Sequence, residues 1–232
     1  MPLFVLTLLI LLGPLSTKAD QLTLHAGDFS SQPTALIFEQ WLAYDFSKIE
    51  KKTRYTHVKH ENEWVIKAES EQSASGLIRK IDIDLEKYPI VSWRWKVTSN
   101  PKNATDDTRQ GDDHAARLYF IFNAPKKSIF GQLKTFFGIP NTHAINYIWA
   151  IDMESGTFRD SPYTDQSIMF AVDTGQQHLG EWVTHRRNLL DDYRKIFDRN
   201  PSLISAVALM TDTDNGQGTV TTYYGDIVFS SE

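Results

Sequence analysis

The sequence predicts an all-β fold: a two-sheet antiparallel sandwich, jelly-roll-like, with one or two short helices. Three observations predict it. Short stretches alternate apolar and polar residues, whereas helical spacing is rare. Clusters of turn-forming residues separate these stretches at intervals of roughly eight to twelve residues, which is typical of sandwiches. Aromatic residues, which favour strands, make up 12% of the chain.

The first residues, 1–19, have the features of a signal peptide. Leu3–Leu12 is an apolar run too short to span a bilayer, and Gly13-Pro14 ends it. Thr17-Lys18-Ala19 places small residues at a common cleavage spacing, although no Lys or Arg precedes the apolar run. We therefore expect a periplasmic or secreted bacterial protein with one β-sandwich domain over residues 20–232.

Composition narrows the classes of partner and chemistry. The formal net charge is -5 and the pI about 5.8, so the basic face of a nucleic-acid-binding protein is not expected. The chain has no cysteine, which excludes disulfides, thiol catalysis and a lipidated cysteine anchor. A hydrophobic content of 41% is enough for one sizeable core.

The strands follow from the alternation along the chain. In Ile90–Val97, Trp93 and Trp95 share one face, and we expect core rather than a sugar-binding platform because inward faces take most large aromatics. The predicted strands are Tyr55–Val58, Trp64–Ala68, Leu77–Leu85, Ile90–Val97, Leu118–Phe122, Ile145–Asp152, Gln166–Val172, Trp182–His185, Leu203–Met210 and Thr219–Phe229.

Two segments have helical spacing. Leu189–Phe197 places apolar residues at i, i+4 and i+8 and ends before Pro201. Asn123–Ala144 is predicted to hold a short amphipathic helix with Ile129, Phe130, Leu133, Phe136 and Phe137 on one face. Packing on the sandwich is the favoured role of this helix. The alternatives are a lid over a site, or a peripheral membrane or protein contact through residues 126–139.

The candidate site begins in Gly111–Phe122, GDDHAARLYFIF, where charged residues precede an apolar strand. We expect this loop to meet a second acidic loop, Thr211–Gly216, at one rim of the sandwich. Arg117 alternates away from the large apolar residues and needs a carboxylate partner, for which Asp113 and Asp226 are the candidates. A structural ion pair is the favoured role of Arg117 and ligand binding the second. The candidate ligand-binding residues are Asp112, Asp113, Arg117, Tyr119, Asp212, Asp214, Asn215 and Asp226.

A metal site is the less favoured interpretation of the acidic loops. Asp212 and Asp214 fit the first ligand positions of an EF-hand, but Gly216 and Tyr223 occupy later ligand positions, so an EF-hand is rejected. A different calcium site at Asp212 and Asp214 is the alternative to a simple Asx-type turn. The spacing of Asp113, His114 and Asp212 is not diagnostic of a transition metal, and no other cofactor is expected.

Six segments together resemble a bacterial family catalogued as domain of unknown function 3047. In chain order they are Ser92–Val97, Gly111–Phe122, Tyr147–Trp149, Asp191–Tyr193, Met210–Asn215 and Tyr224–Phe229. The resemblance implies an exported bacterial protein without an assigned activity, so it transfers no catalytic residues. By analogy, the last strand also looks like the closing strand of galactose-binding-like modules.

The sequence is compatible with three functions. The first is a non-catalytic envelope module that binds a carbohydrate or similar polar small molecule through aromatic and Asp, Asn and Arg side chains. The second is a glycan-active hydrolase or lyase that pairs Asp112 or Asp113 with Asp212 or Asp214. The third is an envelope interaction protein that docks through residues 123–144. Ser-hydrolase, zinc-protease, Walker and dinucleotide-binding motifs are absent from the sequence.

Overall fold

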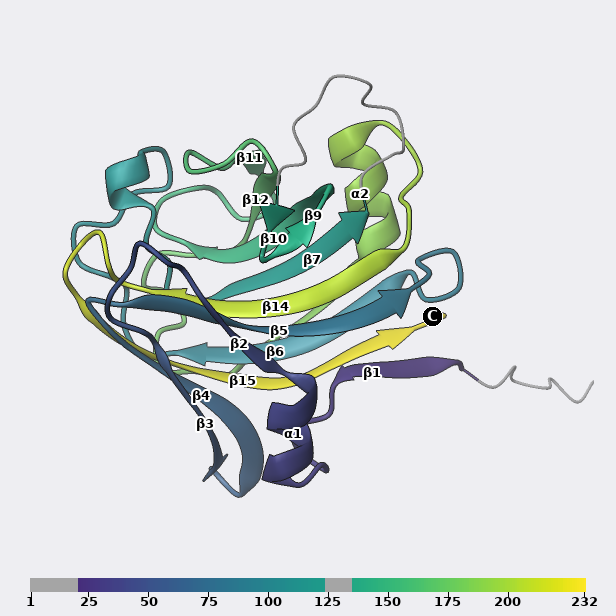
Figure 1. Ribbon diagram of the computed structural model, residues 1–232. Helices are drawn as coiled ribbons and strands as arrows, with labels where there is room; N and C mark the ends of the chain where they lie inside the picture. The colour runs from purple at the N-terminus through teal and green to yellow at the C-terminus, as the bar shows by residue number, and fades with distance from the viewer. Residues whose placement is uncertain (1–20, 124–134) are drawn as a thin grey trace, which may run out of the picture.

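Two β-sheets pack face to face in the computed structural model, which describes residues 21–123 and 135–232 (Figure 1). The predicted signal peptide lies outside the described residues. The first sheet has six strands, with β1 paired to β15 beside the main order. In that order they are β13 (Val183–Asn188), β6 (Ile90–Val97), β15 (Thr219–Ser230), β4 (Glu63–Glu71) and β3 (Arg54–His60), with β1 at Thr23–Gly27.

The second sheet has seven strands, and its outer face carries the candidate site. Their order is β11 (Phe158–Asp160), β12 (Ser167–Thr174), β10 (Thr142–Ala150), β7 (Arg117–Asn123), β14 (Ile204–Asp212), β5 (Ala74–Ile83) and β2 (Leu42–Asp45). The predicted two-sheet sandwich is confirmed. One pair departs from antiparallel pairing: β10 and β12 are parallel, because residues 151–166 carry the chain back along the sheet edge before β12 begins.

In the described part of the chain, three short helical segments accompany the sheets: α1 (Thr34–Gln40), the 3₁₀ turn η1 (Arg109–Gly111) and α2 (Leu189–Phe197). The predicted helix Leu189–Phe197 is confirmed, and Asn188 caps it by accepting a hydrogen bond from the Asp191 amide at 3.1 Å. Within the described residues, no helix is both long and apolar enough to span a bilayer.

The helix predicted in Asn123–Ala144 is wrong at its C-terminal end. Phe136 lies in a small hairpin, β8 (Thr135–Phe136) with β9 (Ile139–Pro140), while residues 124–134 lie outside the described part of the chain. Phe137 and Gly138 adopt positive φ values of 49° and 71°, which turn the backbone back on itself instead of continuing a helix. The spacing of the apolar residues in this segment does not distinguish a helix from a hairpin.

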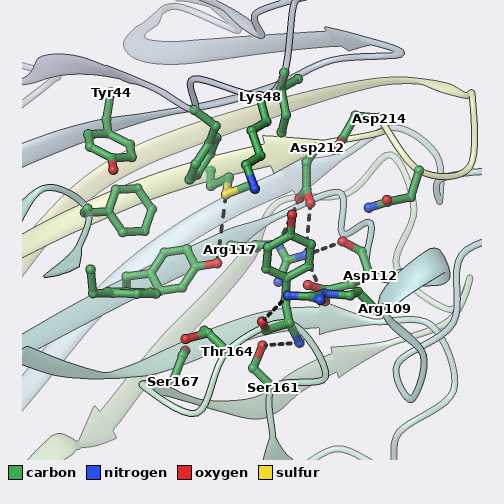
Figure 2. Close-up of a pocket in the computed structure, with 18 of the residues that line it drawn as sticks. Tyr44, Lys48, Arg109, Asp112, Arg117, Ser161, Thr164, Ser167, Asp212 and Asp214 are labelled. Atoms are coloured by element: carbon green, nitrogen blue, oxygen red, sulfur yellow. Dashed lines mark hydrogen bonds and ion pairs between the residues drawn. The ribbon is translucent and has the colours of Figure 1, made fainter. Parts of the chain in front are cut away.

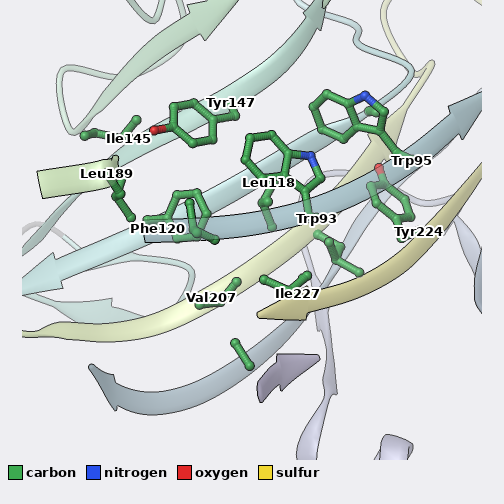
Figure 3. Packing of buried hydrophobic residues seen from close by; sticks show 14 of the residues in the cluster. Trp93, Trp95, Leu118, Phe120, Ile145, Tyr147, Leu189, Val207, Tyr224 and Ile227 are labelled. Carbon is green, nitrogen blue, oxygen red and sulfur yellow. The ribbon is translucent and has the colours of Figure 1, made fainter. Parts of the chain in front are cut away.

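The main core fills the space between the sheets (Figure 3). Trp93 and Trp95 of β6 are both buried there, as predicted from their shared strand face. Trp93 stacks on Tyr147 of the opposite sheet, with ring centroids 5.1 Å apart. A second, smaller cluster lies on the outer face of the seven-stranded sheet, where Phe137 of the hairpin covers Tyr119 and Met210. The hairpin therefore encloses part of a face that would otherwise be open.

The loop that precedes β7 is anchored by Asp106, whose side chain is fully buried. Its carboxylate accepts hydrogen bonds from the backbone amides of Ile151, Asp152 and Met153 at 2.7–3.1 Å. The Nε2 atom of His114 donates a further bond at 3.0 Å. Burial alone would raise the pKa of Asp106, but these hydrogen bonds and His114 lower it well below its usual range. Asp106 thus joins the loop before β7 to the turn after β10.

We expect Asp106→Asn to reduce the free energy of unfolding by about 3 kcal/mol, because an amide cannot accept four donors around one carboxylate. Because the folded pKa is lowered, the stabilisation is complete above the unfolded pKa of about 4 and is lost as pH falls. Urea denaturation should therefore show a large difference from the native protein at pH 7 and a smaller one at pH 3. The exposed neighbour variant Asp107→Asn is the control, and a pH-independent difference would contradict this account.

Candidate functional site

The two acidic loops meet, as the sequence led us to expect. Asp113 accepts hydrogen bonds from the backbone amides of Asn215 at 3.1 Å and Gly216 at 2.5 Å, and from the Asn215 side chain at 3.2 Å. A Cβ atom on Gly216 would lie 1.8 Å from the Lys102 carbonyl oxygen, so only glycine permits this close approach. Asp113 therefore anchors the second acidic loop, Thr211–Gly216, to the first.

Arg117 is paired with Asp212 and Asp112, and the predicted partners Asp113 and Asp226 are wrong. Its Nε and one terminal nitrogen donate to the two carboxylate oxygens of Asp212 at 2.8 and 2.9 Å. The same terminal nitrogen reaches the backbone oxygen of Asp112 at 2.7 Å and its carboxylate at 3.1 Å. Because β7 and β14 are neighbours, with Arg117 opposite Met210, the residue two further along β14 shares its face.

Asp226 belongs to a different part of the molecule. It lies on β15 of the other sheet, where its carboxylate accepts from the backbone amide of Ser30 at 2.8 Å and from the Ser30 hydroxyl. It is therefore separated from the other predicted site residues by the thickness of the sandwich.

The ion network is buried: Arg117 and Asp212 are each 2% exposed. Burial opposes the charge on Arg117, but Asp112 and Asp212 raise its pKa well above the usual range. Burial raises the pKa of Asp212 to about 7, although Arg117 pulls it down. Burial also raises the pKa of Tyr119. The pKa of Asp214 is raised by burial and by the neighbouring negative charge of Asp113. Tyr119 is thus a neutral hydrogen-bonding group beside a permanent cation.

A cavity of about 350 Å³ lies over this network on the outer face of the seven-stranded sheet (Figure 2). The hydroxyl of Ser167 is buried there and has no hydrogen-bond partner in the described structure. Of the predicted residues, Asp112, Arg117, Tyr119, Asp212, Asp214 and Asn215 line the cavity. Asp113 lies behind it and Asp226 far from it.

Several lining residues were not found from the sequence, among them Tyr44, Lys48, Arg109, Tyr163 and Ser167. Arg109 lies over the Tyr163 ring, with its guanidinium carbon 4.5 Å from the centroid, and donates to the Tyr163 carbonyl at 3.1 Å. Tyr163 is 51% exposed, so one ring at the mouth is held in place while accessible to a ligand. A tyrosine in a polar turn is a weak signal, and nothing in the sequence joins Tyr44 or Lys48 to the acidic loops.

A cation site at the acidic loops is constrained by these contacts. Asp113, Asp212 and Asp214 each offer one carboxylate oxygen within 4.8 Å of the other two. Both oxygens of Asp212, however, accept from Arg117, and both oxygens of Asp113 accept from the Asn215–Gly216 backbone. A calcium ion bound to Asp212 and Asp214 would therefore lie beside a guanidinium group, which repels it.

Comparison with known proteins gives a family and a set of similar folds. A family model described as a protein of unknown function (DUF3047) matches residues 39–228. No curated protein matches the sequence. Among solved structures, the endoglucanase Cel12A from Rhodothermus marinus is 10% identical with a TM-score of 0.43, covering 90% of this chain and 98% of that one.

Two further solved structures have similar folds. The carbohydrate recognition domain of Emp46p in its potassium-bound form is 10% identical with a TM-score of 0.43, covering 89% of this chain and 96% of that one. The xylan-binding module CBM86 from Roseburia intestinalis is 10% identical with a TM-score of 0.31, covering 90% and 93%. At this identity the likeness concerns the sandwich fold alone.

We expect Arg117→Met to lower the free energy of unfolding by about 3–5 kcal/mol, because it leaves Asp112 and Asp212 buried without a cation. The double variant Arg117→Met with Asp212→Leu should lose less, because an apolar pair replaces the ion pair. Chemical denaturation checks both, with the exposed Arg186→Met as a control expected to change stability by about 0.5 kcal/mol or less. A double variant whose loss equals the summed losses of Arg117→Met and of Asp212→Leu alone would contradict the account.

Millimolar calcium should move the melting temperature by less than about 1 °C, because Arg117 and the Asn215–Gly216 backbone already occupy the carboxylate oxygens. Differential scanning fluorimetry with calcium and with chelator measures this. A rise of several degrees that Asp214→Asn removes would instead establish calcium binding at Asp212 and Asp214.

Proposed function

We propose that this chain, which belongs to the family of proteins of unknown function DUF3047, is an exported envelope module that binds a carbohydrate in the cavity over Arg117. The proposed location is the periplasm or the exterior, as expected from residues 1–19. The observation that carries the proposal is a cavity that combines accessible rings with fixed hydrogen-bonding groups.

The rings supply the apolar contacts that a sugar ring needs. Tyr163 stands at the mouth with its ring braced by Arg109, and Tyr44 lies on another wall of the same cavity. Aromatic faces pack well against the C–H groups of pyranose rings, and an immobilised ring loses little conformational entropy on binding. Phe137, which contacts Tyr44 at a centroid distance of 5.0 Å, keeps that wall rigid.

The polar groups of the floor supply donors and acceptors for sugar hydroxyls. Ser167 has a buried hydroxyl without a partner, and a ligand hydroxyl would satisfy it. Asp214 lines the cavity and retains accepting capacity, since no side chain in the described structure donates to it. A cavity of about 350 Å³ is within the range that holds one or two sugar units.

A glycan-active hydrolase or lyase is the second candidate. The raised pKa of Asp212, about 7, and the carboxylate oxygens of Asp212 and Asp214 within 4.8 Å favour it, because acid–base pairs have such properties. Against it, Asp212 is 2% exposed and its two oxygens are held by Arg117. We therefore place binding ahead of catalysis. Reducing-sugar release that Asp214→Asn abolishes would reverse that order.

Removal of the Tyr163 ring should weaken glycan binding by about tenfold or more, because it deletes the accessible stacking surface. Isothermal titration calorimetry with cellohexaose, xylohexaose and the hexamer of N-acetylglucosamine would compare the native protein, Tyr163→Ala and Tyr163→Phe. Tyr163→Phe should retain binding.

Phe158→Ala is the matched control, because Phe158 is an exposed ring at the edge of the same sheet that does not line the cavity. Equal loss in Phe158→Ala and Tyr163→Ala, or the absence of heat with every probe and silence on a broad glycan array, would refute the proposal.

A further inference from the structure

A second cavity, of about 440 Å³, lies on the outer face of the six-stranded sheet. We call it the bulge cavity because its floor is the irregular part of β15. Ser92 and Arg94 of β6 face outward there, alternating with the inward Trp93 and Trp95. Asp226 lines this cavity too, so the predicted site residue that is far from Arg117 lies in a hollow of its own.

The bulge fixes the shape of the floor. The register between β15 and β6 shifts between Tyr224 and Ile227, which leaves Gly225 and Asp226 outside regular pairing. A Cβ atom on Gly225 would lie 2.7 Å from the Cγ atom of Arg94, so glycine allows the arginine stem to lie against the backbone.

Two partners hold the guanidinium of Arg94. It forms an ion pair with Glu63, and its central carbon lies 4.5 Å from the ring centroid of Trp182. The cation at the floor of the bulge cavity is therefore positioned before any ligand arrives.

Trp64 gives the bulge cavity an exposed aromatic surface. It is 43% exposed, and the His57 ring packs beside it with centroids 4.9 Å apart. His57 is in turn held on both ring nitrogens, at 2.9 Å from the Thr34 hydroxyl and 2.8 Å from the Phe29 carbonyl oxygen. The indole is therefore braced from one side and accessible from another, which lowers the entropy cost of stacking a ligand on it.

Polar groups surround this indole. Asp226 is oriented by its two hydrogen bonds from Ser30. The side chains of Ser92 and Thr184 line the cavity, and within residues 21–123 and 135–232 neither has a side-chain hydrogen bond. The cavity thus offers fixed acceptors and free hydroxyls beside an indole, a combination that suits a hydroxyl-rich ligand with an apolar ring face.

We propose that the bulge cavity is a second saccharide-binding site, with Trp64 as the stacking surface and with Asp226, Arg94 and Ser92 as the hydrogen-bonding groups. The choice of ligand class rests on the proposed function, but the residues are separate. The two sites lie on opposite outer faces of the sandwich, so one chain can hold two glycan strands or two parts of one polymer. Simultaneous use of both sites raises the apparent affinity for a polymer over that for a short oligosaccharide.

Tryptophan fluorescence separates the two sites. Trp64 lines the bulge cavity and is the tryptophan classed as exposed among the described residues, whereas the described residues around the cavity over Arg117 include no tryptophan. Acrylamide quenching of the indole fluorescence would be measured with and without the three hexasaccharides, in parallel with calorimetry.

We expect at least one hexasaccharide to protect Trp64 from quenching in the native protein and in Tyr163→Ala, which disables the other site. Because the Trp64 variants lack the reporting indole, calorimetry in the Tyr163→Ala background measures them: Trp64→Ala should bind about tenfold more weakly, whereas Trp64→Phe should retain most of the affinity. Leu42→Ala, another exposed apolar residue outside both cavities, is the control, and circular dichroism verifies that each variant is folded.

Calorimetric binding that Tyr163→Ala abolishes, without protection of Trp64, would overturn the second site and leave the proposed function intact. Protection of Trp64 that Tyr163→Ala does not alter, together with calorimetric binding in Tyr163→Ala that the added Trp64→Ala change weakens, would support the second site. No heat and no protection with any probe would overturn both.

Discussion

The structure around the site depends on one buried ion network, in which Arg117 of β7 binds Asp212 of β14 and Asp112 of the preceding loop. A charged guanidinium that is 2% exposed is costly to bury without carboxylates, and the two carboxylates are costly to bury without the cation. The network therefore fixes three segments relative to one another: the loop before β7, the strand β7 itself and the end of β14. These ion pairs hold the floor of the cavity in one arrangement, because separating them would leave buried charges without partners.

The polar residues next to this ion network anchor other segments of the chain. Asp113 and Asp106 are both fully buried, yet neither faces the cavity, because each accepts hydrogen bonds from backbone amides of a different loop. His114 is buried between Asp106 and Asp112, and burial lowers its pKa, so it is a neutral donor to Asp106. Three consecutive polar residues, Asp112, Asp113 and His114, thus have three separate partners. The aspartates of this loop therefore have structural roles as anchors, whether or not they also contact a ligand.

The sequence was sufficient for the fold because alternation reports directly on burial. Trp93 and Trp95 share a strand face and are both in the core, and the helix Leu189–Phe197 follows from its spacing and its end before Pro201. Alternation also predicted which face of the sheet Arg117 lies on. It did not predict which strand is the neighbour of β7, so Asp113 and Asp226 were proposed as partners of Arg117 and Asp212 was not. Local sequence patterns do not reveal strand order, so they do not show which residues from distant parts of the sequence are neighbours in the sheet.

The same limit explains the missed cavity residues. Tyr44 and Lys48 belong to the edge strand β2 and the loop after it, and they reach the site only because β2 pairs at the end of the seven-stranded sheet. Phe136 and Phe137 were predicted to be helical because they continue the helical spacing of Ile129, Phe130 and Leu133, but this spacing does not exclude a hairpin. The signals that decided these positions were the positive φ values at Phe137 and Gly138, which a sequence does not display.

If the cavity over Arg117 binds a ligand as proposed, the charges around it favour a neutral one. Arg117 is already matched by Asp112 and Asp212, so it has little attraction left for an anion. At the rim, Lys48 and Arg109 carry positive charge and Asp214 can oppose it, although burial raises the pKa of Asp214. An anionic ligand would compete with three carboxylates, and a cationic one with a fixed guanidinium. A hydroxyl-rich neutral ligand meets neither penalty, because it can donate to the carboxylates and accept from the arginines at once.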